Sequence, residues 1–153
     1  MLEIVTALGF IGAAAAAAST GAMFPPGKWY DALSKPRWTP PNWLFPLAWT
    51  ALYIAMVYAA WRVAFTPSPG PALALWACQI ALNGLWSPVF FGLQRIGGAL
   101  AAIGPLWLSV VGTTILFFQA DQVAGLLLLP YVVWVSYAAA LNYDIWRRNR
   151  TAS

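Results

Sequence analysis

The amino-acid sequence predicts an all-α membrane protein, a five-transmembrane-helix bundle with a long structured loop between helices 1 and 2. Hydrophobic residues make up 61% of the 153-residue chain and charged residues only 8%, whereas a soluble domain carries roughly 25% charged residues. Five apolar runs are each long enough to cross a hydrocarbon core, which takes about 20 helical residues. The runs are continuous and lack the alternation of membrane-barrel strands.

Each helix is bounded by recognisable turn residues. The first span has Glu3 as its only early charge, so we interpret it as a retained transmembrane helix and not as a signal peptide. The segments "TPSPGP", "GLQRIGG" and "QADQ" separate the later spans, and Asp121 is a predicted N-cap. Because these connections are short, we expect consecutive helices to be antiparallel neighbours. The single domain, 1–153, has predicted helices at about 2–23, 43–65, 72–91, 96–118 and 123–146, with the loop at 24–42.

The basic residues predict how the bundle is oriented. Seven of the eight Lys and Arg residues fall at one end of a five-span bundle, and only Arg62 lies toward the other. The positive-inside rule then places the long loop and the C-terminus in the cytoplasm and the N-terminus outside. This also explains a pI near 9.6 without a nucleic-acid partner. The seven residues are Lys28, Lys35, Arg37, Arg95, Arg147, Arg148 and Arg150.

Ten tryptophans are far more than a chain of this length ordinarily carries. An aromatic belt at the headgroup level explains those near span ends, Trp29, Trp61 and Trp146, together with Tyr30. It does not explain the tryptophans that lie well inside their apolar runs, which are Trp49, Trp76, Trp107 and Trp134.

Helical spacing places aromatic rings and amides on common helix faces. Residues that recur every three or four positions share a face, and polar groups in a bilayer are costly unless they face the bundle interior. We therefore expect a shared aromatic lining, with Gly84 and Ala138 leaving room for a flat apolar ligand. The alternative is that the amides only join helices by hydrogen bonds. The faces are Trp49, Tyr53 and Met56; Trp76, Gln79, Asn83 and Trp86; and Tyr131, Trp134, Ala138 and Asn142.

Three segments resemble the signature segments of the translocator protein family, also known as tryptophan-rich sensory proteins or peripheral-type benzodiazepine receptors. They are "WYDALSKPRWTPPNWLFPLAWTALY" (29–53), "NGLWSPVFF" (83–91) and "LPYVVWVSYAAALNYDIW" (129–146). The chain resembles a bacterial member of this family. The resemblance implies a five-helix bundle, commonly a homodimer, in a bacterial membrane. It does not distinguish between the inner and the outer membrane. It also implies binding of porphyrins and, in some members, of cholesterol and isoquinoline or benzodiazepine ligands, in a cavity under the first loop.

The resemblance also implies site residues. Prolines 36, 40 and 41 stiffen the loop, which would fold over the helix ends as a lid. Porphyrin propionates could meet Lys28, Lys35 and Arg37 there, although membrane topology explains these charges equally well. Leu141, Tyr143 and Arg147 fit a proposed sterol pattern, but Tyr143 is equally well explained as an interfacial anchor. The predicted ligand-binding residues are Trp38, Trp49, Tyr53, Asn83, Trp86, Trp134, Ala138 and Asn142.

Residues for catalysis and metal binding are scarce. Histidine is absent, Cys78 is the only cysteine, and the four carboxylates are scattered, so we predict no metal site and no required cofactor. The predicted function is a membrane receptor or sensor that binds porphyrins and regulates tetrapyrrole or stress responses. The alternatives are a porphyrin or sterol transporter, or a light- and oxygen-dependent porphyrin-degrading enzyme that uses Trp49 and Trp134.

Small residues suggest where two copies of the chain could pack. Small side chains let membrane helices approach closely. The candidate faces for a homodimer are Gly9, Ala13 and Ala17, or Ser109 and Thr113, with packing inside one chain as the alternative.

Overall fold

The computed structural model describes residues 1–150 and confirms the all-α fold class. Five helical stretches are long and apolar enough to cross a membrane, and their ends lie within about three residues of the predicted ones. A short helix, α2, lies in the loop between the first two spans. The elements are α1 (Leu2–Met23), α2 (Lys28–Ala32), α3 (Leu44–Ala64), α4 (Gly70–Ser87), the π-helix η1 (Pro88–Gly92), α5 (Ile96–Ala120) and α6 (Gln122–Asn149).

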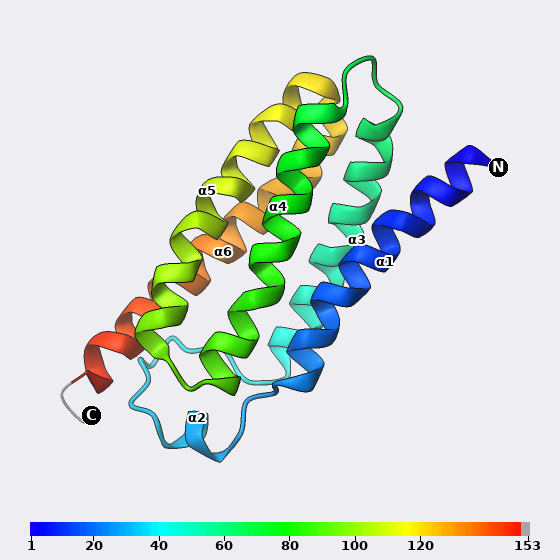
Figure 1. Ribbon diagram of the computed structural model, residues 1–153. Helices are drawn as coiled ribbons and strands as arrows, with labels where there is room; N and C mark the ends of the chain where they lie inside the picture. The colour runs from blue at the N-terminus through cyan, green and yellow to red at the C-terminus, as the bar shows by residue number, and fades with distance from the viewer. Residues whose placement is uncertain (151–153) are drawn as a thin grey trace.

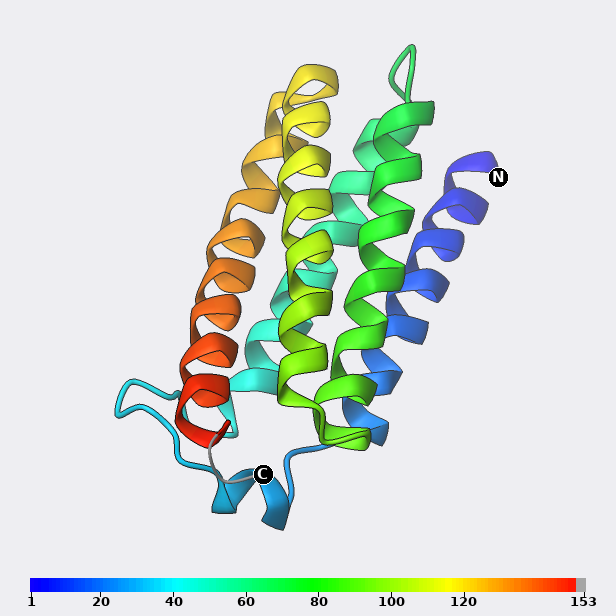
Figure 2. The ribbon, with the colours of Figure 1, turned by 60° about the vertical axis from the view of Figure 1, so that its left-hand side comes forward.

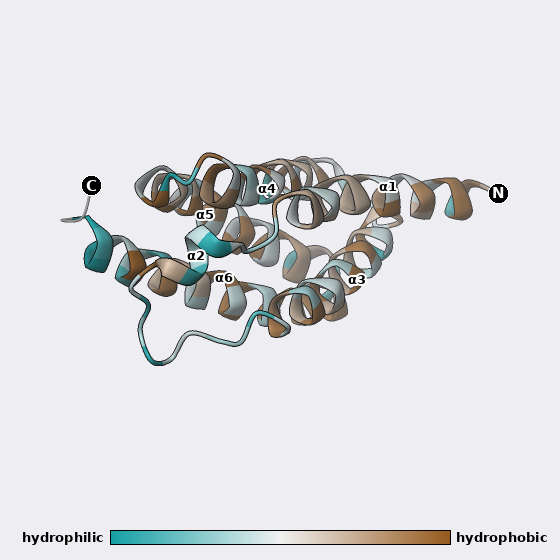
Figure 3. Ribbon diagram, turned by 90° about the horizontal axis from the view of Figure 1, so that it is seen from below, coloured by the Kyte–Doolittle hydropathy of each residue, from teal (hydrophilic) through white to brown (hydrophobic). Residues whose placement is uncertain are grey.

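The five long helices form two layers, with α5, α4 and α1 in one and α6 and α3 in the other (Figure 3). The main helix–helix contacts close a ring in the order α1, α3, α6, α5, α4. The expectation that consecutive helices are neighbours is correct for α4–α5 and α5–α6. For α3 and α4 it is only partly correct, because each packs more extensively against α1 than against the other, although Tyr53 of α3 donates a hydrogen bond to Asn83 of α4. A short loop limits the distance between two helix ends but does not decide which helix faces pack.

The core lies chiefly between α3, α4, α5 and α6. Met56, Val110, Phe117 and Leu128 are buried there. In contrast, α1 contributes only Ala14 and Ala17 to the buried residues, and its N-terminal half runs away from the other helices (Figure 1). The first helix is therefore the least tightly packed part of the bundle.

The predicted cap of the last helix is confirmed. The Asp121 carboxylate accepts a hydrogen bond from the backbone N–H of Ala124 at 3.0 Å, which satisfies one of the free donors at the start of α6. The same carboxylate pairs with the Arg62 guanidinium at 2.8 Å. The hydrogen bond from Arg62 lowers the pKa of Asp121 below its usual value. Arg62 thus ties the end of α3 to the turn between α5 and α6.

A proline changes the helix type at the end of α4. Pro88 has no N–H to donate, and the next turn widens so that the N–H of Leu93 donates to the carbonyl of Pro88 at 2.8 Å. Wide turns of this kind frequently occur at functional sites. Gln94 ends the turn with φ = 55°, in the left-handed region. The widened turn brings Phe90 and Phe91 against the loop.

The loop folds across one end of the bundle, with α2 beneath the helix ends (Figure 2). Tyr30 of α2 is 3% exposed and packs edge-on against Phe90 and Phe91. The assignment of Tyr30 to an interfacial belt is therefore wrong, because its ring is enclosed by aromatic side chains. Burial raises the pKa of Tyr30 to about 12.

Three of the five residues proposed for the dimer faces lie inside the bundle. Ser109 and Thr113 are 7% and 1% exposed, and their hydroxyls donate to carbonyls within α5. Ala17 is buried against Gly84 of α4, where an added Cβ would lie 3.5 Å from the Ala17 Cα. These three residues pack within one chain, as the alternative in the sequence analysis proposed, whereas Gly9 is exposed.

Candidate ligand cavity

A cavity of about 1150 Å³ lies between the helices, at the end of the bundle that the loop covers. All five long helices contribute to its walls, with Ala18 on α1, Trp49 on α3, Asn83 on α4, Leu106 on α5 and Trp134 on α6. No Asp, Glu, Lys or Arg is among the lining residues. The volume exceeds the range of about 300–1000 Å³ that is typical of small-molecule sites.

One wall of the cavity is aromatic. Trp49 of α3 and Trp134 of α6 pack edge-to-face against one another, with ring centroids 6.3 Å apart and planes at 88°. Phe45 packs edge-on against Trp134, and Tyr53 lies beside Trp49. Edge-to-face and offset contacts of this kind are the favoured aromatic geometries. The wall therefore offers several flat surfaces to a bound molecule.

A chain of hydrogen bonds fixes the polar side of the cavity. Tyr53 donates its hydroxyl proton to the Asn83 carbonyl oxygen at 2.8 Å, and the Asn83 amide donates to the hydroxyl of Tyr131 at 2.7 Å. Tyr131 donates in turn to Gln79 at 2.7 Å. Asn83 therefore joins three helices by hydrogen bonds and also lines the cavity, so the two interpretations in the sequence analysis both apply to it.

A second amide lies behind the wall. The Trp86 ring N–H donates to Asn142 at 3.2 Å, and the Asn142 amide donates to the carbonyl of Ile96 at 3.1 Å. Asn142 is 1% exposed and is not among the lining residues. Trp86 does line the cavity, where its ring stacks on Phe90 with centroids 4.9 Å apart. Asn142 thus positions Trp86 and joins α4, α5 and α6.

The Trp134 ring N–H is buried and has no hydrogen-bond partner in the part of the chain that the structure describes. An unpaired buried donor is costly, and most buried polar groups find a partner. Trp134 lines the cavity with other atoms of its ring, whereas its N–H is enclosed by the protein.

The loop is fastened to the last helix at two points. The Tyr137 hydroxyl donates to the carbonyl of Trp38 at 2.6 Å, and the two rings pack edge-on. Asn149 exchanges two hydrogen bonds with the backbone of Ser34, at 3.0 and 2.9 Å. Trp38 therefore holds the loop in place and is not among the lining residues. Sequence reasoning missed Asn149, since 115 positions separate it from its partner.

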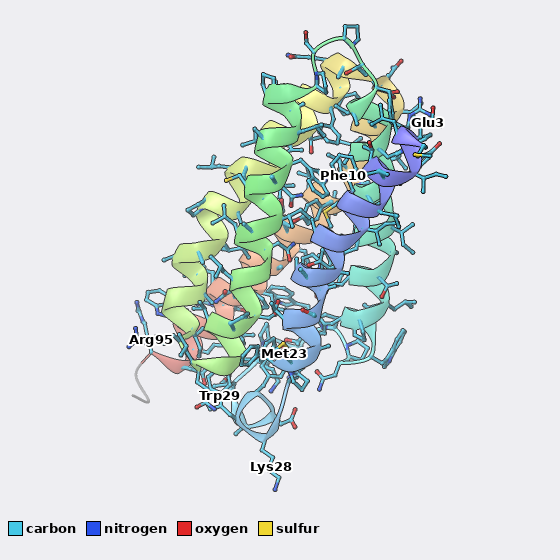
Figure 4. All side chains as sticks on the ribbon, turned by 45° about the vertical axis from the view of Figure 1, so that its right-hand side comes forward. Glu3, Phe10, Met23, Lys28, Trp29 and Arg95 are labelled. Atoms are coloured by element: carbon cyan, nitrogen blue, oxygen red, sulfur yellow. The ribbon has the colours of Figure 1, made fainter. Side chains whose placement is uncertain are left out.

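None of the three basic residues proposed for propionates lines the cavity. Lys28 is exposed and points away from the helices (Figure 4). The Lys35 ammonium donates to the carbonyls of Tyr30, Asp31 and Leu33. Arg37 is exposed on the loop. Lys35 thus organises the end of α2, which the sequence pattern did not indicate.

The residues of the sterol pattern are not gathered at one site. Leu141 is buried, whereas Tyr143 is 51% exposed and lies beside Trp146. Arg147 pairs with Asp144 at 3.0 Å. The motif spacing places Leu141 inward and the other two outward, so these three side chains form no common surface.

Sequence reasoning also missed the α1 side of the cavity. Ile11, Ala15 and Ala18 line it from α1, opposite Ile54 and Tyr58 of α3. The signal was the run "GAAAAAAS", whose short side chains leave space beside a neighbouring helix. Residues 1–150 contain no cluster of three or more His, Cys, Asp or Glu side chains that could hold a metal ion.

The fold and the cavity together define the class of the protein. The chain is a multi-pass α-helical membrane protein with an aromatic cavity between its five spans. The profile of the TspO/MBR family matches residues 4–147, and the chain belongs to this family. It is 51% identical over 141 residues to Protein CrtK of Rhodobacter capsulatus, covering 90% of this chain and 88% of that protein. It is 50% identical to the tryptophan-rich sensory protein of Cereibacter sphaeroides (93% and 90% covered) and 36% identical to the human translocator protein (95% and 90%).

Proposed function

We propose that this membrane protein is a receptor or sensor that binds a porphyrin, or a comparably flat apolar molecule, in the cavity against the adjoining rings of Trp49 and Trp134. The observation that carries the proposal is the pair of adjoining indole rings that line an uncharged cavity. Relatives named translocator protein and tryptophan-rich sensory protein support a receptor role in a membrane. Isoquinoline and benzodiazepine compounds share this flat apolar chemistry and would use the same walls.

The energetics suit binding in the micromolar range. Such an affinity needs about −8 kcal/mol. Two or three ring contacts at about 0.5–1.5 kcal/mol each, added to the burial of apolar surface, can supply it after ordering costs are met.

Charged propionates would lie outside the cavity, because no cationic side chain lines it. Among the three basic loop residues, we favour Arg37 for this contact. Lys28 points away from the helices, and Lys35 would have to leave three carbonyl partners. Arg37 precedes Trp38, which is fastened to α6 beside the cavity wall.

Titration of the purified protein with protoporphyrin IX, followed through the absorbance of the porphyrin, tests the proposal. The Trp134→Leu variant removes one of the two adjoining indole rings, and we expect the Kd to rise about threefold to tenfold. Trp107→Leu is the matched control, because Trp107 is exposed and its ring N–H bonds to Ser136 away from the cavity. Equal affinities of the Trp134→Leu variant and the wild-type protein would contradict the proposed site.

The same preparation separates the alternative functions. Illumination under air that yields a new porphyrin product, lost in the Trp134→Phe variant, would indicate a porphyrin-degrading enzyme. Movement of the porphyrin across sealed liposomes would indicate a transporter. Binding with neither result is expected for a receptor or sensor.

A further inference from the structure

The cavity opens toward one side of the bundle. A side chain that lines the cavity and is also exposed marks an opening in its wall. Within residues 1–150, such side chains occur on α1, on α3 and in the adjoining ends of the loop, whereas the lining residues of α4, α5 and α6 are all buried or half-buried. Ile54 and Tyr58 of α3 are 66% and 46% exposed, and Ile11 of α1 is 49% exposed. The opening therefore lies between α1 and α3.

This opening, the mouth, lies within the membrane-spanning parts of both helices. We define it by Ile11 and Ala15 of α1 and by Thr50, Ile54 and Tyr58 of α3. The three α3 residues recur every four positions, so they follow one face of the helix. The Thr50 hydroxyl donates to a carbonyl of its own helix at 2.7 Å, which leaves the mouth apolar. The mouth therefore faces the hydrocarbon part of the bilayer.

On its α4 side, α1 is packed closely. An added Cβ on Gly84 of α4 would lie 3.5 Å from the Ala17 Cα, and one on Gly92 of η1 would lie 2.8 Å from the ring of Phe24. At the far end, the Trp61 ring N–H of α3 donates to a carbonyl in the first turn of α1 at 3.3 Å. The opening is therefore confined to the stretch of the α1–α3 boundary between this contact and the loop.

The loop closes the end of the cavity and is fastened to α6. Tyr137 donates to the carbonyl of Trp38, and Asn149 exchanges two hydrogen bonds with the backbone of Ser34. Tyr30 of α2 is buried beneath the helix ends. A route beneath the loop would have to break such contacts, whereas a route through the mouth leaves all of them in place.

A sideways route also suits a flat ring that carries carboxylates at one edge. A charged group is very costly in hydrocarbon, but a ring that moves sideways keeps its carboxylates at the depth of the headgroups. The opening continues to the loop end of the bundle, where Asn42 and Pro46 line the cavity and are exposed. Propionates can therefore stay at the loop end, outside the cavity, while the ring passes between α1 and α3.

We propose that the ligand enters and leaves through the mouth, directly from the lipid bilayer, while the loop stays fastened as a fixed roof. This inference rests on the proposed function and specifies the source of the ligand for the same site. A side chain that only obstructs a passage raises the barrier in both directions. It therefore changes kon and koff by the same factor and leaves the Kd unchanged, whereas a residue of the binding site changes the Kd.

The test measures the quenching of tryptophan fluorescence by protoporphyrin IX in liposomes that contain an excess of the protein. The slope and the intercept of the observed rate against protein per lipid give kon and koff, in the range where the rate rises with protein and insertion into lipid is not limiting. The Ala15→Phe variant narrows the mouth, and we expect both rate constants to fall about fivefold. The Ile54→Ala variant widens it, and both should rise. Ala16→Phe is the matched control, since Ala16 is exposed on the same helix but does not line the cavity.

The Asn149→Ala variant tests the route beneath the loop, because it removes both hydrogen bonds to Ser34. We expect its rate constants to equal those of the wild-type protein. If they rise, the ligand passes beneath the loop, and the inference is overturned while ring binding stands.

The remaining outcomes also decide between the two proposals. Unchanged rates in the mouth variants, or a changed Kd without parallel changes in kon and koff, would contradict the inference alone. If Ala15→Phe does not fold, Ile54→Ala must raise both rate constants, or the inference is wrong. If protoporphyrin IX does not bind to the wild-type protein, the proposed function itself fails.

Discussion

Asn83 shows how one side chain serves both the stability of the bundle and the shape of the cavity. It accepts a hydrogen bond from Tyr53 and donates one to Tyr131, so three helices meet at a single amide. Tyr131 is buried and passes the chain of hydrogen bonds on to Gln79. Such bonds in membranes average about 0.6 kcal/mol each, but a buried group left without a partner costs about 1–3 kcal/mol.

The Asn83→Leu variant should therefore unfold at a lower temperature than the wild-type protein. Loss of the Asn83 amide leaves the Tyr53 hydroxyl without its acceptor and the Tyr131 hydroxyl without its donor. We therefore expect the free energy of unfolding to fall by about 1–3 kcal/mol. Thermal unfolding in detergent, followed by circular dichroism, measures it. Tyr53→Phe is the control, because it removes one bond and should cost less. Equal unfolding temperatures of Asn83→Leu and wild type would show that the amide has no structural role.

Periodicity could predict which residues of α3 and α6 share a face, and the structure brings Trp49 and Trp134 together in the lining of one cavity. The same reasoning could not show that Lys35 organises the loop or that Asn149 holds Ser34. Polar contacts between a loop and a distant helix depend on where the loop folds, and helical spacing carries no information about that. The positive charge of Lys35 therefore led to the prediction of a contact with the ligand, whereas the structure shows that Lys35 makes contacts that stabilise the loop.

At the scale of elements, Asp121 joins α3, α5 and α6 through one carboxylate. It caps α6 through the N–H of Ala124 and pairs with Arg62. The hydrogen bond from Arg62 holds the pKa of this carboxyl below its usual value. Since the folded-state pKa is the lower one, the resulting stability is present above the unfolded-state pKa of about 3.9 and is lost as the pH falls through the folded-state value.

We therefore expect the stability of the wild-type protein to drop below about pH 4 more steeply than that of the Asp121→Asn variant. Asparagine can still cap the helix but does not titrate in this range. Unfolding midpoints measured from pH 3 to pH 7 for both proteins give the comparison, and their difference isolates Asp121 from the other three carboxylates. Parallel pH profiles would show that the ion pair has no measurable effect. The Asp121→Ala variant should also lose the cap, at a cost of about 1 kcal/mol near neutral pH.

The helix boundaries could be predicted closely because apolar runs and turn residues are local features. The order of helices around the ring could not, since it depends on which faces are complementary. Gly84 illustrates this, because its lack of a side chain lets α4 approach Ala17 of α1, so that α4 packs more closely against α1 than against α3. The π-helix after Pro88 was missed for a related reason, because a proline there is equally consistent with a kink or a plain helix end.

At the scale of the whole molecule, charge is distributed between the two ends of the bundle. The structure places the loop, Arg95 and the C-terminal arginines at one end, and Glu3 lies at the opposite end (Figure 4). The only basic side chain near the second end, Arg62, is paired with Asp121. The loop that fastens over the cavity and the C-terminal turn of α6 are therefore on the same membrane side.

This asymmetry predicts that the loop end faces the cytoplasm. With Cys78 replaced by alanine, single Ser34→Cys and Ser68→Cys substitutions give a matched pair, since both serines are exposed and lie at opposite ends of the bundle. A membrane-impermeant maleimide added to intact cells should label the Ser68→Cys protein and leave the Ser34→Cys protein unlabelled until the membrane is opened. The reverse pattern would invert the orientation. Because the basic loop would then face away from the cytoplasm, that result would also remove the topological explanation for its charges and leave ligand or lipid contact as their main role.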